Sequence, residues 1–181
     1  MKEGAQAVID FWFEECEPKQ WWSNDAKFDQ LITKRFADIH AKAVAGELFA
    51  WRHSAIGRLA EIIILDQFSR NIYRGTPQAF SSDSLALCLA QHAISHNCHN
   101  ELTDEQRQFL YMPFMHSESP AIHVIAERLF NEPQMGKNKE FERLHKVIID
   151  RFGRYPHRND ILGRESTAEE IEFLKQPNSS F

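Results

Sequence analysis

A stripe of polar residues continues the apolar face of one predicted helix. Asp66, Gln67, Arg70 and Arg74 recur at spacings of three and four residues, which places their side chains on one helix face. Polar groups on the inner face of a helix must be paired or must line a cleft, because burying them alone costs free energy. Asp66 stands four residues before Arg70, the order that favours an ion pair. The stripe is therefore either a structural ion pair or, with Asn71, one wall of a binding site.

A histidine and a glutamate stand together just before another predicted helix. His116, Ser117 and Glu118 precede a helix start, where free backbone N–H groups favour an anion. Imidazole titrates near neutral pH, so His116 beside Glu118 has the chemistry of a general acid or base. The competing interpretation is that Ser117 and Glu118 only cap the helix. Tyr111, shortly before this turn, is a candidate for the apolar floor of a site.

The remaining candidate residues occupy one long loop. About 13 residues without predicted secondary structure follow Gly153 and end near Ser166, and ordered loops of that length are commonly functional. An arginine side chain suits bidentate capture of a carboxylate or a phosphate. The loop is either part of a binding site or a solvated segment with scattered charge. Its candidate side chains are Arg154, His157, Arg158, Asn159 and Arg164.

Helices must position these groups, since helical periodicity extends along almost the whole chain and no strand alternation competes with it. Start signals include the capping pairs Thr103 with Gln106 and Ser166 with Glu169. Short connections predict antiparallel neighbours. We therefore predict an all-α fold of about eight helices as antiparallel hairpins, stacked in a right-handed array or closed into a bundle. The predicted helices lie at about residues 5–16, 28–43, 54–74, 82–95, from 103 onward, 119–130, 141–152 and 166–177.

Composition places the chain among ordinary globular proteins. Its 181 residues are 43% hydrophobic and 26% charged, which excludes wholesale disorder. Nothing in the composition divides the chain, so we predict a single domain over residues 1–181. The net charge of −5 argues against a nucleic-acid binder. No run of residues approaches the ~20 apolar residues of a membrane helix, and we expect no secretory signal.

Cysteine usage and missing motifs narrow the chemistry further. The three cysteines are widely spaced and lack metal-type pairing, so we expect reduced thiols in a cytoplasmic protein. Zinc-type ligand spacing is missing, which predicts no metal site. Neither a glycine-rich phosphate loop nor a dinucleotide fingerprint occurs, which predicts no cofactor. The sequence leaves the oligomeric state open.

The polar blocks resemble those of a bacterial family known as domain of unknown function 924. The specific blocks are Leu65–Pro77, His116–Glu118 and Phe152–Asn159, and the similarity extends from Val8 to Leu174. The family pattern usually has proline where Ser69 stands here, and serine at this position should straighten the helix. The resemblance implies an all-helical, tetratricopeptide-like fold. It implies no established activity.

Two classes of function fit these residues, and the sequence does not decide whether the chain is an enzyme. The first is a cytoplasmic helical domain that binds a small anionic molecule or an acidic peptide group in a cleft lined by arginine and histidine. The second is a hydrolase that uses Asp66, His116, Glu118 and His157 for acid–base chemistry. A protein-interaction scaffold is a third possibility. The predicted ligand-binding residues are Asp66, Gln67, Arg70, Asn71, Arg74, Tyr111, His116, Glu118, Arg154, His157, Arg158, Asn159 and Arg164.

Both leading hypotheses require these separate blocks to meet. Inward polar groups on a central helix need partners, because leaving one unpaired costs about 1–3 kcal/mol. Outside the helix that carries Asp66 and Arg70, the polar segments with an ordered pattern are the turn at 116–118 and the loop at 153–166. We therefore expect all three blocks to converge on one cleft.

Overall fold

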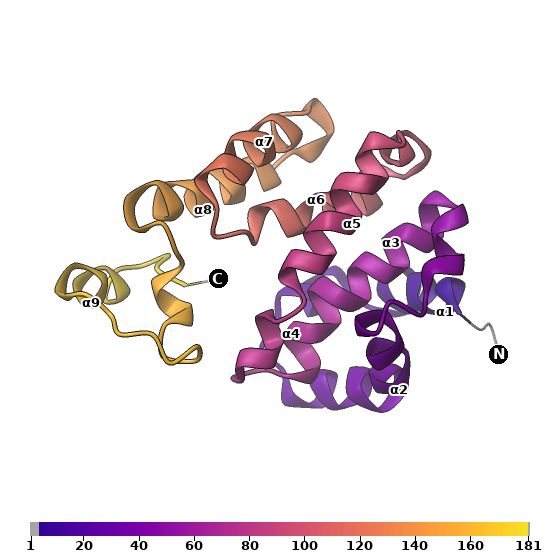
Figure 1. Ribbon diagram of the computed structural model, residues 1–181, viewed down its shortest axis with the longest axis horizontal. Helices are drawn as coiled ribbons and strands as arrows, with labels where there is room; N and C mark the ends of the chain where they lie inside the picture. Colours follow the sequence, from indigo (N-terminus) through magenta and orange to yellow (C-terminus); the bar gives the residue numbers. More distant parts are fainter. Residues whose placement is uncertain (1–3, 181) are drawn as a thin grey trace. The chain divides into compact units, whose positions relative to one another are not determined.

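The computed structural model describes residues 4–180, and residues 1–3 and 181 lie outside the described part. Its helices (Figure 1) form two compact units, which are described separately. The first unit contains the chain up to residue 74 together with residues 78–113, and the second contains residues 75–77 and the chain from residue 114 onward. The single domain predicted over residues 1–181 stays a prediction.

All regular structure between residues 4 and 180 is helical, which confirms the all-α prediction. The α-helices of this described part are α1 (Ala5–Asp10), α2 (Ala26–Val44), α3 (Ala55–Ile63), α4 (Ser69–Ile72), α5 (Asp83–Ser95), α6 (Asp104–Met115), α7 (Pro120–Phe130), α8 (Asn138–Phe152) and α9 (Ala168–Leu174). Short 3-10 turns cover Pro18–Trp22, Phe49–His53, Pro77–Phe80, Cys98–Glu101, Pro133–Met135 and Pro156–Arg158. None of the helices described combines the length and apolar content needed to cross a membrane. The stacked array and the closed bundle both stay predictions.

Local capping explains where several helices begin and end. The Ser54 hydroxyl accepts a hydrogen bond from the Gly57 N–H at 3.0 Å and starts α3. The predicted capping box of α6 is confirmed: the Gln106 side chain accepts from the Thr103 N–H at 3.0 Å, and the Thr103 hydroxyl accepts from the Gln106 N–H at 3.2 Å. Gly153 follows α8 in the left-handed conformation, with φ of 68°, which ends that helix as predicted.

The capping box of α9 lies one residue later than predicted. The Thr167 hydroxyl accepts from the Glu170 N–H at 3.2 Å, and the Glu170 carboxylate accepts from the Thr167 N–H at 2.8 Å. The predicted pair, Ser166 with Glu169, has the same spacing, so the pattern alone could not separate the two. The difference is tertiary, because Glu170 is also the ion-pair partner of Arg154.

The first unit is built around the continuous rod of α3 and α4. A π-helical turn, Ile64–Phe68, joins the two helices. The helix predicted over about 54–74 therefore contains a π-helical turn, a feature that often occurs at specialised positions. The straightening expected from Ser69 stays a prediction. A second π-helical turn, Phe11–Glu15, continues α1. The ring of Trp12 in this turn contacts that of Phe68 with centroids 5.5 Å apart. Helices α1 and α5 pack against α3, and α2 packs against α4.

The second unit has a helical hairpin, α7 with α8, as its largest packed pair (Figure 1). Ile148 and Ile149 of α8 are buried together with Tyr155, which follows the helix. Phe152 and Phe173 cover this cluster, with ring centroids 5.0 Å apart, and so connect α8 to α9. Burial of these side chains supplies the apolar driving force that orders the long loop after α8.

Gly57 provides a test of the packing at the start of α3. A β-carbon at this position would lie 2.0 Å from the backbone carbonyl oxygen of Trp51, so the backbone itself would have to move. We expect Gly57→Ala to lower the free energy of unfolding by at least about 2 kcal/mol. Denaturation with urea, followed by circular dichroism, measures the change.

Gly46→Ala is the matched control. Gly46 has φ of 73°, but a β-carbon there would meet no atom within 4 Å. Only backbone strain of about 1 kcal/mol is therefore expected. If Gly57→Ala proved as stable as the unsubstituted chain, the close approach of α3 to Trp51 would be contradicted.

Candidate functional site

Asp66 lies in the π-helical turn and is fully buried. The Gln67 side-chain amide donates to one of its carboxylate oxygens at 2.6 Å. Nη1 of Arg70 donates to the Asp66 backbone carbonyl at 2.6 Å and lies 3.4 Å from the other carboxylate oxygen. The predicted ion pair between Asp66 and Arg70 is therefore confirmed, and the partners of the carboxylate include residues of its own helical rod.

Arg70 has a closer carboxylate partner that the sequence did not indicate. Its guanidinium donates to both oxygens of Asp83, at 3.0 and 3.1 Å, and so fastens the rod to the first residue of α5. A bidentate pair of this kind satisfies the planar fork of arginine. The only local signal was an acidic residue in the first turn of a predicted helix, which equally suits the helix dipole.

The next polar pair on the rod joins α4 to α2. The Asn71 amide donates to one oxygen of Asp29 at 2.8 Å, and Arg74 donates to both oxygens, at 2.6 and 2.8 Å. Burial of Asp29 opposes ionisation, but the hydrogen bonds from Arg74 and Asn71 outweigh it and keep the pKa of Asp29 below its ordinary value. These contacts favour the structural interpretation of the polar stripe.

The predicted turn and the predicted arginine loop meet in the second unit. Arg164 donates to both carboxylate oxygens of Glu118, at 2.6 and 2.9 Å, and the Tyr155 N–H donates to the same carboxylate at 2.7 Å. Burial of Glu118 opposes ionisation, but these hydrogen bonds outweigh it, so the pKa of Glu118 lies below its ordinary value. Nη2 of Arg158 donates to the His116 backbone carbonyl at 3.1 Å. Residues 116–118 and 153–166 are thus in direct contact, as expected.

A second ion pair connects the same loop to α9. Arg154 donates to both oxygens of the buried Glu170, at 2.7 and 2.8 Å. The Asn159 amide donates to Glu170 at 3.3 Å, and its carbonyl oxygen accepts from Nε of Arg164 at 3.0 Å. Hydrogen bonding to Arg154 is the main cause of the low pKa of Glu170, about 2. The long loop is therefore an ordered network rather than a solvated segment.

Tyr155 anchors a buried chain of polar groups. Its hydroxyl donates to the Met115 carbonyl at 2.6 Å and lies 3.2 Å from Nε2 of His123. That nitrogen also lies 2.8 Å from the Ser117 carbonyl, which can only accept, so Nε2 carries a hydrogen. Nδ1 of His123 lies 2.8 Å from a carboxylate oxygen of Glu142. Burial of Glu142 raises its pKa above the ordinary value, and the hydrogen bond with His123 opposes this.

One predicted acid–base residue, His157, lies against the same tyrosine, and a second, His116, contacts Arg158 through its backbone carbonyl. The His157 ring lies 5.6 Å from the Tyr155 ring, and both His157 and His116 are half-buried. The guanidinium of Arg158 covers the Tyr155 ring at 4.6 Å, and this side chain is only 6% exposed. Arg158 therefore supports the loop as well as lying near the histidines.

The predicted site residues divide between the two units. The polar stripe and the buried Tyr111 belong to the first unit, whereas the turn at 116–118 and the loop at 153–166 belong to the second. Contact between the turn and the loop is confirmed by the hydrogen bonds of Glu118 and Arg158. Convergence of all three blocks on one cleft stays a prediction.

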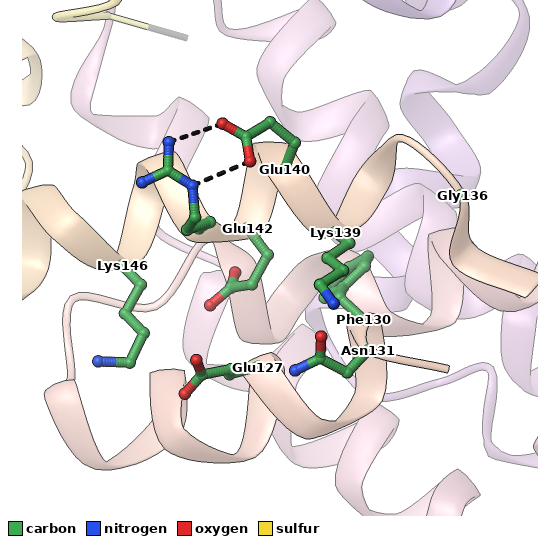
Figure 2. A pocket seen from close by; sticks show the side chains of 9 residues that line it. Glu127, Phe130, Asn131, Gly136, Lys139, Glu140, Glu142 and Lys146 are labelled. Atoms are coloured by element: carbon green, nitrogen blue, oxygen red, sulfur yellow. Dashed lines mark hydrogen bonds and ion pairs between the residues drawn. The ribbon is translucent and has the colours of Figure 1, made fainter. Parts of the chain in front are cut away.

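A pocket that the sequence did not reveal lies in the second unit, between α7 and α8. Its volume is about 210 Å³. Figure 2 shows the Glu142 carboxylate projecting from α8 toward α7, where Glu127 lies, while the Lys139 amino group points toward Asn131. The buried Phe130 contributes an apolar wall. The lining residues are Glu127, Phe130, Asn131, Gly136, Lys139, Glu140, Glu142, Arg143 and Lys146.

Some of the charged groups in this pocket already have partners. Arg143 donates to both oxygens of Glu140, at 2.9 and 2.7 Å, and Lys146 donates to Asp150 at 2.5 Å. Within residues 4–180, the side chains of Lys139, Asn131 and Glu127 make no hydrogen bond or ion pair.

The chain matches a family model described as "Bacterial protein of unknown function (DUF924)" over residues 8–178. The chain belongs to this family. A solved structure of a protein of unknown function from Agrobacterium tumefaciens shares 39% sequence identity and superposes with a TM-score of 0.90, covering 94% of this chain and 96% of that chain. No curated protein matches. The DUF924 relatives therefore support the fold and supply no activity.

Ser69, at the start of α4, has hydrogen-bond partners on two elements of the fold. Its hydroxyl donates to the Leu65 carbonyl at 2.6 Å, so the contact of 2.8 Å with Nε2 of His40 must use a hydrogen from the imidazole. Burial lowers the pKa of His40, in agreement with a neutral ring. The serine thus joins the rod of α3 and α4 to α2.

The pair of Glu170 with Arg154 predicts a specific dependence on pH. Because the folded carboxyl has a pKa of about 2 against an ordinary 4.5, the stability it contributes is present above pH 4.5 and lost as the pH falls toward 2. We expect Glu170→Gln to lower the free energy of unfolding at neutral pH by about 1.5–3 kcal/mol and to flatten its fall in this acid range. Urea denaturation at a series of pH values measures both effects.

Glu172→Gln is the matched control on α9, because Glu172 forms only an exposed pair with Lys175. We expect this variant to leave the fall of the free energy of unfolding between pH 4.5 and 2 unchanged, since exposed ion pairs contribute little to stability. If stability fell as steeply in acid for Glu170→Gln as for the unsubstituted chain, the low pKa of Glu170 would be contradicted.

Proposed function

We propose that this chain is a binding protein for a small molecule with an acidic group, and that Lys139 and Asn131 hold this group in the pocket between α7 and α8. The observation that carries the proposal is the set of polar side chains that line the pocket without a partner in residues 4–180. A lysine ammonium and a side-chain amide both donate hydrogen bonds to a carboxylate or phosphate. The apolar wall formed by Phe130 excludes water from one side of the ligand.

The arginines that the sequence offered for this role have partners within the chain. Arg70 and Arg74 bind Asp83 and Asp29, and Arg154 binds Glu170. Arg164 similarly binds Glu118. An external anion would have to displace a carboxylate from each of these arginines, and breaking a partly buried pair leaves a charge without compensation. Lys139 can bind an anion without that cost.

The geometry also favours binding over hydrolysis. A general acid must hold a proton that it can donate at the working pH. Glu118 has a pKa below its ordinary value and both oxygens engaged, and Asp66 is fully buried beside Gln67 and Arg70. These two carboxylates therefore stabilise the fold and take no part in acid–base chemistry.

A second candidate position for an anion is the surface beside Tyr155. It is supported by the half-exposed His157, whose ring lies 5.6 Å from that of Tyr155, and by the half-exposed His116, whose backbone carbonyl accepts from Arg158. We also propose a cytoplasmic protein, an assignment supported by three free cysteines, Cys16, Cys88 and Cys98.

The proposal is tested by thermal unfolding in the presence of simple anions. Acetate and phosphate, added as sodium salts at constant ionic strength, should raise the Tm by about 2–4 °C when present well above Kd, because they bind only the folded chain. Lys139→Gln should remove most of the shift. Lys137→Gln, two residues earlier at the exposed start of α8, is the control and should retain it.

Two outcomes would contradict the pocket assignment. One is a Tm that neither anion changes. The other is an equal loss of the shift in Lys137→Gln and Lys139→Gln, which would indicate a diffuse effect of surface charge. A shift lost in Arg158→Lys and retained in Lys139→Gln would transfer the site to the second candidate position.

A further inference from the structure

Within residues 4–180, one buried carboxylate oxygen of a residue that lines the α7–α8 pocket lacks a hydrogen-bond partner. Glu142 is 1% exposed, and its Oε1 pairs with Nδ1 of His123 at 2.8 Å. Its Oε2 is buried and has no hydrogen-bond partner in the part of the chain that is described. A buried oxygen without a hydrogen-bond partner lowers the stability of the fold by about 1–3 kcal/mol or more, because both oxygens of a buried carboxylate normally accept hydrogen bonds. A donor from outside the chain would remove the cost.

A second carboxylate lies on the opposite helix. Figure 2 shows Glu127 of α7 facing Glu142 of α8 across the pocket. Burial is the main cause of the raised pKa of Glu142, and His123 opposes it; the like charge of Glu127 raises this pKa further, and Lys146 lowers it. The ammonium of Lys146, however, is hydrogen-bonded to Asp150 at 2.5 Å. The negative part of the pocket is therefore suited to a positively charged group.

The pocket is small and contains side chains of opposite charge, which limits the class of ligand that fits it. Lys139 and Asn131 offer donors in one part, and Glu127 and Glu142 offer acceptors in another. The volume of about 210 Å³ is below the roughly 300–1,000 Å³ of pockets for drug-sized ligands. Among residues 4–180, no group of three or more His, Cys, Asp or Glu side chains has the geometry to hold a metal ion. A compact organic zwitterion satisfies both parts of the pocket.

We infer that the ligand is a small amino-carboxylate, whose ammonium group lies between Glu142 and Glu127 while its carboxylate meets Lys139 and Asn131. This inference rests on the proposed function and adds the second charged group of the ligand. An ammonium carries three N–H donors, enough to bond Oε2 of Glu142 and the Glu127 carboxylate together. Binding would pair the buried oxygen and relieve the repulsion between the two glutamates.

Calorimetric titration of the full chain tests the inference with matched probes. Glycine and β-alanine carry both groups, whereas acetate and propionate carry only the acid. We expect the amino-carboxylates to bind about ten- to a hundredfold more tightly than the corresponding acids, the ratio expected for a hydrogen-bonded charge at a buried carboxylate. Glu142→Gln and Glu127→Gln should each remove most of this preference and leave the affinity for acetate nearly unchanged.

The variants are chosen so that a folding defect cannot obscure the result. Glu142 is buried against His123, so circular dichroism is used to verify that Glu142→Gln is folded. Glu127 is exposed, and Glu127→Gln therefore tests the same prediction without that risk. Glu140→Gln is the control, because Glu140 also lines the pocket but pairs with Arg143. It should retain the preference.

The outcomes separate failure of the inference from failure of the proposed function. Equal affinity for acids and amino-carboxylates, sensitive to Lys139→Gln, would overturn the inference and leave the proposed function standing. A preference for amino-carboxylates that survives Glu127→Gln would also overturn the inference. Absence of binding by all four probes at millimolar concentration would contradict both.

Discussion

A carboxylate that is withdrawn from water must meet hydrogen-bond donors, and this constraint explains the ion pairs that join distant segments within each unit. Arg70 meets Asp83, and Arg164 meets Glu118, in each case from a different element of the fold. Each pair fixes two elements together, because removing one partner would leave the other partly buried and charged. Glu142 departs from this rule, since only one of its oxygens has a hydrogen-bond partner within residues 4–180. Glu142 lines the α7–α8 pocket, and its unpaired oxygen is the reason for proposing a positively charged group on the ligand.

Elements that depend on local signals could be predicted from the sequence, and those that depend on distant partners could not. Thr103 with Gln106 and the glycine at 153 mark helix ends because their hydrogen bonds or dihedral angles are local. The π-helical turn at Ile64–Phe68 has no such marker. Glu142 was missed because its importance depends on His123, nineteen residues earlier on another helix.

The blocks that carry the family resemblance are explained mainly by the fold. Arg154 and Glu118 lie within those blocks, and both form ion pairs that hold the long loop in place. The pocket that we propose for the ligand lies between them in sequence, in a stretch where no motif drew attention. The charged sequence motifs therefore indicated the ion pairs that stabilise the loop. The pocket residues of α7 and α8 that lack partners within residues 4–180 could be recognised only from the structure.

Amide chemical shifts test the central claim, that a small ligand binds in the α7–α8 pocket and not at the arginines, which already have carboxylate partners. The measurement is a titration of the ¹⁵N-labelled chain with β-alanine, followed residue by residue. The account predicts that the largest shifts fall within residues 127–146, with Asn131 and Gly136 among them. Largest shifts in the loop at 153–166, or along the rod that carries Asp66, would contradict it.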